Sequence, residues 1–233
     1  MFPSVQSAFR AFSEKFEGSV PFMYLDILGL VTVGVGNLVD PVDLAKALPF
    51  RFKNKPGTTT PGSPATTEQI ASEWQRLKGD QSLAQKGFKA CEPITNLELS
   101  DDSINALIMD RLTKNESFLK GQQWFHNFDN WPADAQLGLL SMAWAMGPGG
   151  PVGFPKFRAA CQSMDFNTTA AECKMNEAGN PGIIARNQAN FVLFSNAAIV
   201  LANGSFQLQD LQYPNQLKNT SGGQTHAALG SSD

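Results

Sequence analysis

Apolar residues recur at the spacing of an amphipathic helix along most of the chain. The first such segment covers residues 4–17, which Ser4 can cap and Gly18 can end. Its apolar face consists of Val5, Ala8, Phe9, Phe12 and Phe16. Further helices are predicted over residues 40–48, 66–78, 100–112, 134–146, 157–164 and 183–202. The 134–146 segment is apolar or small on nearly every side and is therefore expected to be a central helix.

One segment has a different pattern. Residues 20–37 are rich in Val, Leu and Ile and are interrupted by Gly29, Gly34 and Gly36. This pattern predicts a short β-hairpin or a three-stranded meander with glycine kinks. One helix, a small β element and then many helices indicate an α+β fold. We expect a small β-containing lobe, a larger helical lobe and a binding cleft between them.

Two segments lack such patterns. Residues 49–66 contain four prolines among threonines and glycines, which predicts an exposed loop. Thr66 and Gln69 have the spacing of a capping box, so a helix should begin where this loop ends. The last thirty or so residues are rich in Asn, Gln, Ser, Thr and Gly, and we expect them to fray or wrap loosely.

Composition narrows the classes of function. The 233 residues, of which 42% are hydrophobic, are enough for a proper core. A net charge of −3 argues against nucleic-acid binding, which needs a basic face. Two histidines, one of them His226 in the polar tail, leave little room for a zinc site or a histidine-based triad. We therefore expect carboxylates to be the working groups of an enzyme, with no metal and no cofactor.

Cysteine content and hydropathy bear on the compartment. Three cysteines do not form a disulfide scaffold in a chain of this length; Cys161 and Cys173 could pair, or all three thiols, with Cys91, could be free. No apolar run is long enough for a membrane helix, and residues 1–17 do not resemble a signal peptide. The expectation is a chain made in soluble form that needs another route out of the cytoplasm.

The candidate chemistry lies between Phe16 and Asn37. Glu17 ends the first helix beside a phenylalanine, so its carboxyl is expected to be partly desolvated, which favours the protonated form of an acid. Asp26 and Thr32 lie on the glycine-kinked β element, where Asp26 should be solvated and ionised. Glycoside hydrolysis needs two carboxyls in different environments, one to donate a proton and one to activate water or stabilise charge. A threonine hydroxyl near the aspartate could hold the attacking water. The alternative is a helix-ending Glu, a turn Asp and a strand Thr with no shared role.

This stretch resembles the catalytic segment of phage-type lysozymes, the muramidases among tailed-phage endolysins. Glu17, Asp26 and Thr32 fall at the family's spacing of nine and then six residues. Tyr24, Gly29, Gly34 and Gly36 are in register as well, and further matches occur at Thr66–Gln69, Met142–Gly147, Gly150–Phe154 and Arg186, eight residues before Phe194. The resemblance covers most of residues 4–202; it is strongest in the N-terminal part and looser after residue 150.

The resemblance implies a lysozyme-like fold and roles for single residues. Glu17 would be the general acid, Asp26 would position or activate water with Thr32, and the outcome would be inversion. Arg186 would lie against Glu17, either to tune it or as a structural salt bridge. The implied catalytic domain covers 1–203, with a small lobe at 18–65 and a helical lobe of 66–203 plus helix 4–17; residues 204–233 form a polar tail.

Two positions depart from the family pattern. Asn37 stands where these lysozymes often carry a histidine, and Ala145 replaces a polar residue of the groove. The family's histidine serves stability, so its ion pair is absent here, and sugar contacts at Ala145 must differ. The three residues of the implied catalytic site are unchanged.

The implied substrate is the glycan strand of peptidoglycan, cut between N-acetylmuramic acid and N-acetylglucosamine. The net charge of −3 removes the attraction that basic endolysins have for the anionic wall. It favours a muramidase delivered to the periplasm, such as a type VI secretion effector with an immunity protein, over a phage endolysin released by a holin. A catalytically inactive wall-binding module and a lytic transglycosylase are the competing interpretations.

Overall fold

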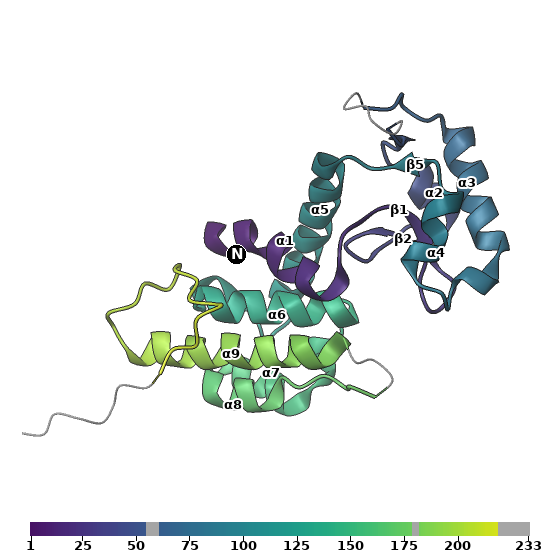
Figure 1. The fold of residues 1–233 in the computed structure, drawn as a ribbon. Coiled ribbons are helices and arrows are strands. Elements are labelled where there is room, and N and C mark those ends of the chain that lie inside the picture. The colour runs from purple at the N-terminus through teal and green to yellow at the C-terminus, as the bar shows by residue number, and fades with distance from the viewer. Residues whose placement is uncertain (55–60, 179–181, 219–233) are drawn as a thin grey trace, which may run out of the picture. The chain divides into compact units, whose positions relative to one another are not determined.

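The computed structural model describes residues 1–54, 61–178 and 182–218, and it is mainly helical with a few short strands (Figure 1). This confirms the expected α+β class. The longer helices are α1 (Pro3–Glu17), α3 (Thr67–Gly79), α5 (Asp101–Lys120), α6 (Ala133–Met146) and α9 (Gly182–Ala202). The shorter ones are α2 (Val42–Lys46), α4 (Phe88–Cys91), α7 (Pro155–Gln162) and α8 (Phe166–Glu172).

The chain divides into two compact units. We call one the mixed unit; it consists of Gln6–Leu119 and Glu177–Arg186 and contains all the strands of the described residues. We call the other the helical unit; it consists of Met1–Val5, Lys120–Asn176 and Asn187–Asp233. Every residue that the sequence singled out for chemistry belongs to the mixed unit.

The predicted meander forms the main sheet of the mixed unit. Strands β1 (Val20–Leu25), β2 (Val31–Gly34) and β3 (Asn37–Leu38) are antiparallel in the order β1-β2-β3. Tyr24 on β1 pairs with Thr32 on β2. All four residues of β2, the central strand of this sheet, are buried.

A second, smaller sheet was not predicted. Strand β4 (Arg51–Phe52) pairs with β5 (Leu97–Glu98), and Arg51 also bridges to Pro64. The expectation of a plain exposed loop over residues 49–66 is therefore wrong at Arg51 and Phe52, while residues 55–60 lie outside the described residues. Two-residue strands are too short for an alternation of apolar and polar positions to be recognised.

Helix α3 begins as predicted and buries a carboxylate. The Thr66 hydroxyl accepts from the Gln69 N–H, and the Gln69 side chain accepts from the Thr66 N–H, so both halves of the capping box are present. One turn further along, Glu73 accepts N–H groups from Asn96 and Leu97 of the second sheet. Burial raises the pKa of Glu73, although these two hydrogen bonds oppose the shift.

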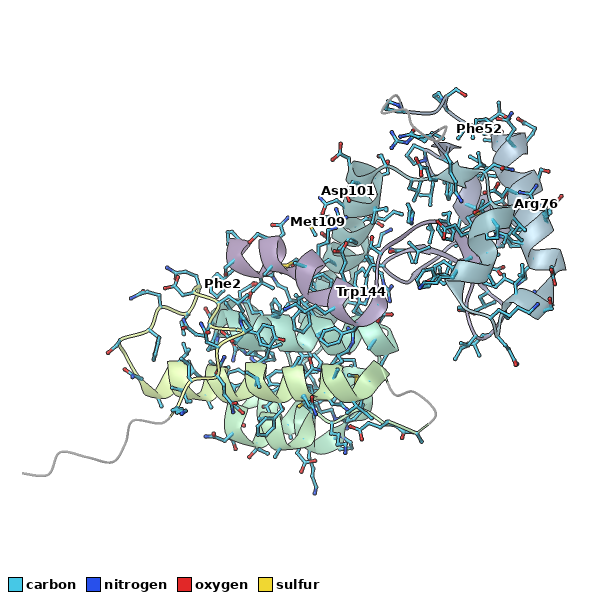
Figure 2. The ribbon with its side chains drawn as sticks, viewed as in Figure 1. Phe2, Phe52, Arg76, Asp101, Met109 and Trp144 are labelled. Atoms are coloured by element: carbon cyan, nitrogen blue, oxygen red, sulfur yellow. The ribbon has the colours of Figure 1, made fainter. Side chains whose placement is uncertain are left out.

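Helix α1 is joined to α5 within the mixed unit. Arg10 forms an ion pair with Asp101 in the first turn of α5, and Gln6 contacts the Met109 sulfur. Figure 2 shows Asp101 and Met109 projecting from α5. These contacts fix the helix at whose last residue Glu17 lies.

The start of α1 differs from the prediction. The helix begins at Pro3, so Ser4 lies inside its first turn and is not the cap. The Ser4 hydroxyl instead donates to the Gln209 carbonyl within the helical unit. Proline is well suited to the first position of a helix because its missing N–H has no partner there.

The helical unit is built on α6, as the sequence predicted. Residues 133–144 of this helix are all buried, and Gly138 lies directly against the Phe194 ring of α9. Figure 1 shows α6 and α9 running alongside each other. Edge-to-face aromatic pairs extend this core, and they join Phe125–Trp131, Trp131–Phe166 and Phe157–Phe194.

The polar segment after α9 is anchored as far as Lys218. Gln212 and Tyr213 donate their N–H groups to the buried carboxylate of Asp134, and Leu217 donates to Asn196 Oδ1. The expectation of a loose tail is therefore wrong for this part, because composition does not reveal the buried acceptors that α6 and α9 supply. The rest of the predicted tail, with His226, lies outside the described residues.

The three cysteines are buried and free. Burial raises the pKa of the Cys173 thiol to about 12, so this group stays protonated at neutral pH. Within the described ranges, no helix is both long and apolar enough to span a bilayer.

Candidate functional site

Glu17 lies at the end of α1, where the chain turns sharply. Gly18 has φ +70°, a conformation that glycine adopts easily, and its N–H closes the helix on the Glu14 carbonyl at 2.9 Å. The helix thereby ends with the Glu17 side chain 33% exposed. A carboxyl in this position can both touch the protein and meet a ligand.

Arg186 is the direct partner of Glu17. Its Nη2 lies 2.6 Å from Glu17 Oε1, although the two residues are 169 positions apart in the sequence. The Arg186 side chain is 1% exposed, and its guanidinium stacks 4.7 Å above the Phe16 ring. Burial lowers the pKa of Arg186, and the charge of Glu17 opposes that shift. The contact that the resemblance implied is thus present in the structure.

Arg111 adds a second cation near Glu17, and the sequence analysis missed it. Its Nη1 donates to the Gly36 carbonyl at 2.8 Å. Burial lowers the pKa of Arg111; the charge of Glu17 opposes this, and the charge of Arg186 adds to it. Arg111 lies between Ile108 and Leu112 of the α5 pattern, which marks it as close to the apolar face. Nothing in the sequence pattern links it to Glu17.

The loop between β2 and β3 approaches the same carboxylate. Gly36 has φ +69°, and a Cβ added there would lie 3.5 Å from Glu17 Oε2. The two Glu17 oxygens therefore have different neighbours. Oε1 meets the Arg186 guanidinium, and Oε2 faces the backbone at Gly36.

Asp26 organises the turn between β1 and β2. Its Oδ1 accepts the N–H groups of Leu28 and Leu30, both at 2.9 Å. The Gly29 N–H closes the turn on the Asp26 carbonyl, and Gly29 has φ +72°. This explains the position of the glycine and fixes one oxygen of the carboxylate, which is half-buried.

Thr32 and Tyr24 face each other across β1 and β2. The Thr32 side chain is 5% exposed, and its hydroxyl makes a long contact of 3.5 Å to the Leu30 carbonyl. Burial, with smaller effects from Glu17 and Asp26, raises the pKa of Tyr24 to about 12. Tyr24 is therefore within electrostatic reach of both carboxylates and keeps its proton at neutral pH. It also packs edge-on against Phe88, 6.2 Å away between centroids.

A groove of about 450 Å³ begins at Gly36 and continues between β3 and α5. Its lining combines apolar side chains with amides and charges: Asn37, Leu38, Val39, Leu44, Leu107, Asp110, Arg111, Lys114 and Asn115. Sequence reasoning found Asn37 only as a departure from a family pattern and did not find the groove.

The site has the components of acid–base chemistry. It offers one carboxyl against a buried guanidinium, a second carboxyl fixed by backbone N–H groups, and a threonine hydroxyl on the strand beside it. Over the described stretches of chain, no group of three or more His, Cys, Asp or Glu side chains is placed to hold a metal ion.

No protein-family model matches the sequence, and comparison with curated proteins gives no match either. The function is therefore inferred from the geometry of the mixed unit and from the motif within it.

Proposed function

We propose that this protein is a muramidase with a lysozyme-like fold, which hydrolyses the β-1,4 bond between N-acetylmuramic acid and N-acetylglucosamine in peptidoglycan. The observation that carries the proposal is the ion pair between Glu17 and Arg186. Spacing alone could pair Glu17 with Asp26 and Thr32 by chance. The resemblance also places Arg186, 169 positions away, against the Glu17 carboxylate, and such a contact is less easily produced by chance.

Glu17 is the general acid of this proposal. In its protonated form, the partly exposed side chain can approach the glycosidic oxygen and give it the proton as the bond to the sugar breaks. The carboxylate that remains is stabilised by Arg186 at 2.6 Å. Arg111 holds the Gly36 backbone on the other side and adds positive potential.

Asp26 is the base that orients the attacking water. Leu28 and Leu30 fix its Oδ1, which restricts the direction in which Oδ2 can point. Thr32, with its weakly held hydroxyl, is suited to hold the same water. Attack from the face opposite the leaving group would invert the anomeric centre.

The protein's charge bears on its biology. With a net charge of −3 it gains no electrostatic attraction to an anionic wall. We therefore favour a delivered antibacterial effector, opposed by an immunity protein, over a phage endolysin. An inhibitor of such an effector would be expected to cover Glu17.

Zymography with purified peptidoglycan tests the activity. Wild type is expected to clear the gel and Glu17→Gln to leave it opaque, because the amide keeps the shape of the side chain but has no acidic proton to transfer. The matched control is Glu14→Gln, one turn earlier in α1, where the carboxylate pairs with Arg10 at 2.8 Å. Glu14→Gln should clear the gel as wild type does.

Three outcomes would contradict the proposal. Wild type that leaves the gel uncleared would indicate a wall-binding module without catalysis. Clearing by Glu17→Gln would reject the assigned acid. Anhydro-muramic ends in mass spectra of the products would identify a lytic transglycosylase, which needs the acid but has no use for Asp26 as a base.

A further inference from the structure

Two asparagines that line the groove lack partners for one amide atom each. Asn37 on β3 is 7% exposed and Asn115 on α5 is 4% exposed. Asn37 Oδ1 and Asn115 Nδ2 make no hydrogen bond to any described part of the chain. Buried amides are nearly always satisfied, and an unsatisfied one costs stability, so such a pair at one groove needs an explanation.

The two atoms differ in chemistry. Asn37 Oδ1 is an acceptor and Asn115 Nδ2 is a donor. The terminal torsion of asparagine is soft, so either amide can rotate and change the direction of its oxygen and nitrogen. Leu38, Leu44 and Leu107 give the same groove apolar wall. The groove therefore offers one donor, one acceptor and an apolar surface.

An acetamido group has the complementary set: one N–H, one carbonyl oxygen and a methyl group. We propose that the groove binds the N-acetyl group of an amino sugar, through its N–H to Asn37 Oδ1 and its carbonyl to Asn115 Nδ2. This inference rests on the proposed function, because it takes the ligand of the groove to be the glycan on which Glu17 acts.

The location of the groove suits this ligand. Gly36 belongs to the groove lining and also lies against Glu17 Oε2. Gly36 is therefore shared by the groove and by the surroundings of the proposed acid.

Charge adds discrimination against de-N-acetylated sugars. Removal of the acetyl group leaves an ammonium, which cannot accept a hydrogen bond from Asn115. Arg111 also lines the groove, and Lys114 lies on it in an ion pair with Asp110 at 2.7 Å. An ammonium would meet the positive potential of Arg111 and be disfavoured.

Calorimetric titration of the full-length Glu17→Gln protein tests the inference, because this variant should bind glycan without cutting it. The probes are N-acetylchitotetraose and its fully de-N-acetylated counterpart. We expect the acetylated probe to bind at least about tenfold more tightly, equivalent to about 1.4 kcal/mol. Asn115→Leu, added to Glu17→Gln, should abolish that preference.

The matched control is Asn105→Leu, an exposed amide on the same helix, which should keep the preference. A second measurement needs no substitution in the groove. In the Glu17→Gln protein, the side-chain NH2 resonances of Asn115 should shift with the acetylated probe and not with the other. Equal binding of both probes, or unchanged Asn115 resonances, would overturn the inference.

The outcomes also separate the two proposals. Asn115-dependent binding of the acetylated probe by a protein that never cuts peptidoglycan would reject the muramidase and keep the groove assignment. If the wild type hydrolyses peptidoglycan and the acetyl preference of the Glu17→Gln protein survives Asn115→Leu, the groove assignment is rejected and the muramidase is kept.

Discussion

The helical unit places Asp134 in the first turn of α6 with no exposed surface, whereas the mixed unit leaves Glu17, at the last residue of α1, one-third exposed. Asp134 accepts hydrogen bonds from Gln212, Tyr213 and Asn196, all at 2.9–3.0 Å. Burial raises the pKa of Asp134, and the hydrogen bonds lower it in part. Glu17 meets the Arg186 guanidinium and keeps an exposed edge.

The same contrast holds for two stacked arginines. Arg158 in the helical unit lies 4.3 Å over the Trp124 ring and donates to the Val152 carbonyl at 2.8 Å. Arg186 in the mixed unit lies over Phe16 and donates to the Glu17 carboxylate. Arg158 thus donates to a backbone carbonyl, whereas Arg186 donates to a side chain that is partly exposed.

These pairs show why residue type alone does not indicate function. A carboxylate whose two oxygens are both hydrogen-bonded inside the protein contributes to folding, whereas one with an exposed edge is available for chemistry. Matched substitutions in the two units can test that distinction, because each pair makes the same chemical change in both environments.

The largest contrast is expected from Asp→Asn. Asp26→Asn should lower the rate of peptidoglycan hydrolysis by about 10²-fold or more, since an amide cannot accept the water's proton. Its Oδ1 can still accept from Leu28 and Leu30, so the melting temperature should change little. Rates from turbidity assays and melting by circular dichroism measure the two effects.

Asp134→Asn should show the reverse. Its new NH2 group would face one of the N–H donors that now meet the carboxylate, at a cost of about 1–3 kcal/mol. The melting temperature should fall by several degrees, while the rate per folded molecule stays near that of wild type. A rate loss in Asp134→Asn equal to that of Asp26→Asn would erase the distinction between the units.

The helices and the main sheet could be predicted because long periodic patterns determine them. The apolar face of α1, the capping box at Thr66 and the apolar 134–146 segment each specify an element locally. Helices α4 and α8 were missed, and so were strands β4 and β5, which have only two residues each.

The candidate site could be predicted only in part. The resemblance indicated Glu17, Asp26, Thr32 and Arg186 from fixed offsets, and the structure adds the contact between the first and the last. Arg111 and the orphaned amides could not be found, because a hydrogen bond from α5 to the Gly36 carbonyl depends on tertiary packing. The sequence around either residue therefore gives no sign of this contact.

A second, smaller contrast is expected from Gly→Ala. In Gly138→Ala the new Cβ would lie 2.8 Å from Phe194 Cζ, so the helical core must shift, at a cost of about 1–3 kcal/mol. In Gly36→Ala the methyl has room but the backbone is at φ +69°, which costs about 1–2 kcal/mol. Both variants should melt earlier, yet only Gly36→Ala should also lose activity, because its methyl lies beside Glu17. Full activity in Gly36→Ala would remove this loop from the site.

The smallest contrast is expected from Arg→Lys at the two stacked arginines. In both variants an ammonium replaces a planar guanidinium, so stacking and directed hydrogen bonding are lost while the charge remains. Arg158→Lys should cost about 1 kcal/mol of stability and leave the rate per folded molecule unchanged. Arg186→Lys should cost a similar amount and also lower the rate several-fold, because the lysine holds Glu17 less firmly. The decisive readout is rate at equal folded concentration, with Arg186→Met as a further step. If lysine and methionine at 186 both leave the rate intact, Arg186 is a structural salt bridge and Glu17 is positioned by α1 alone.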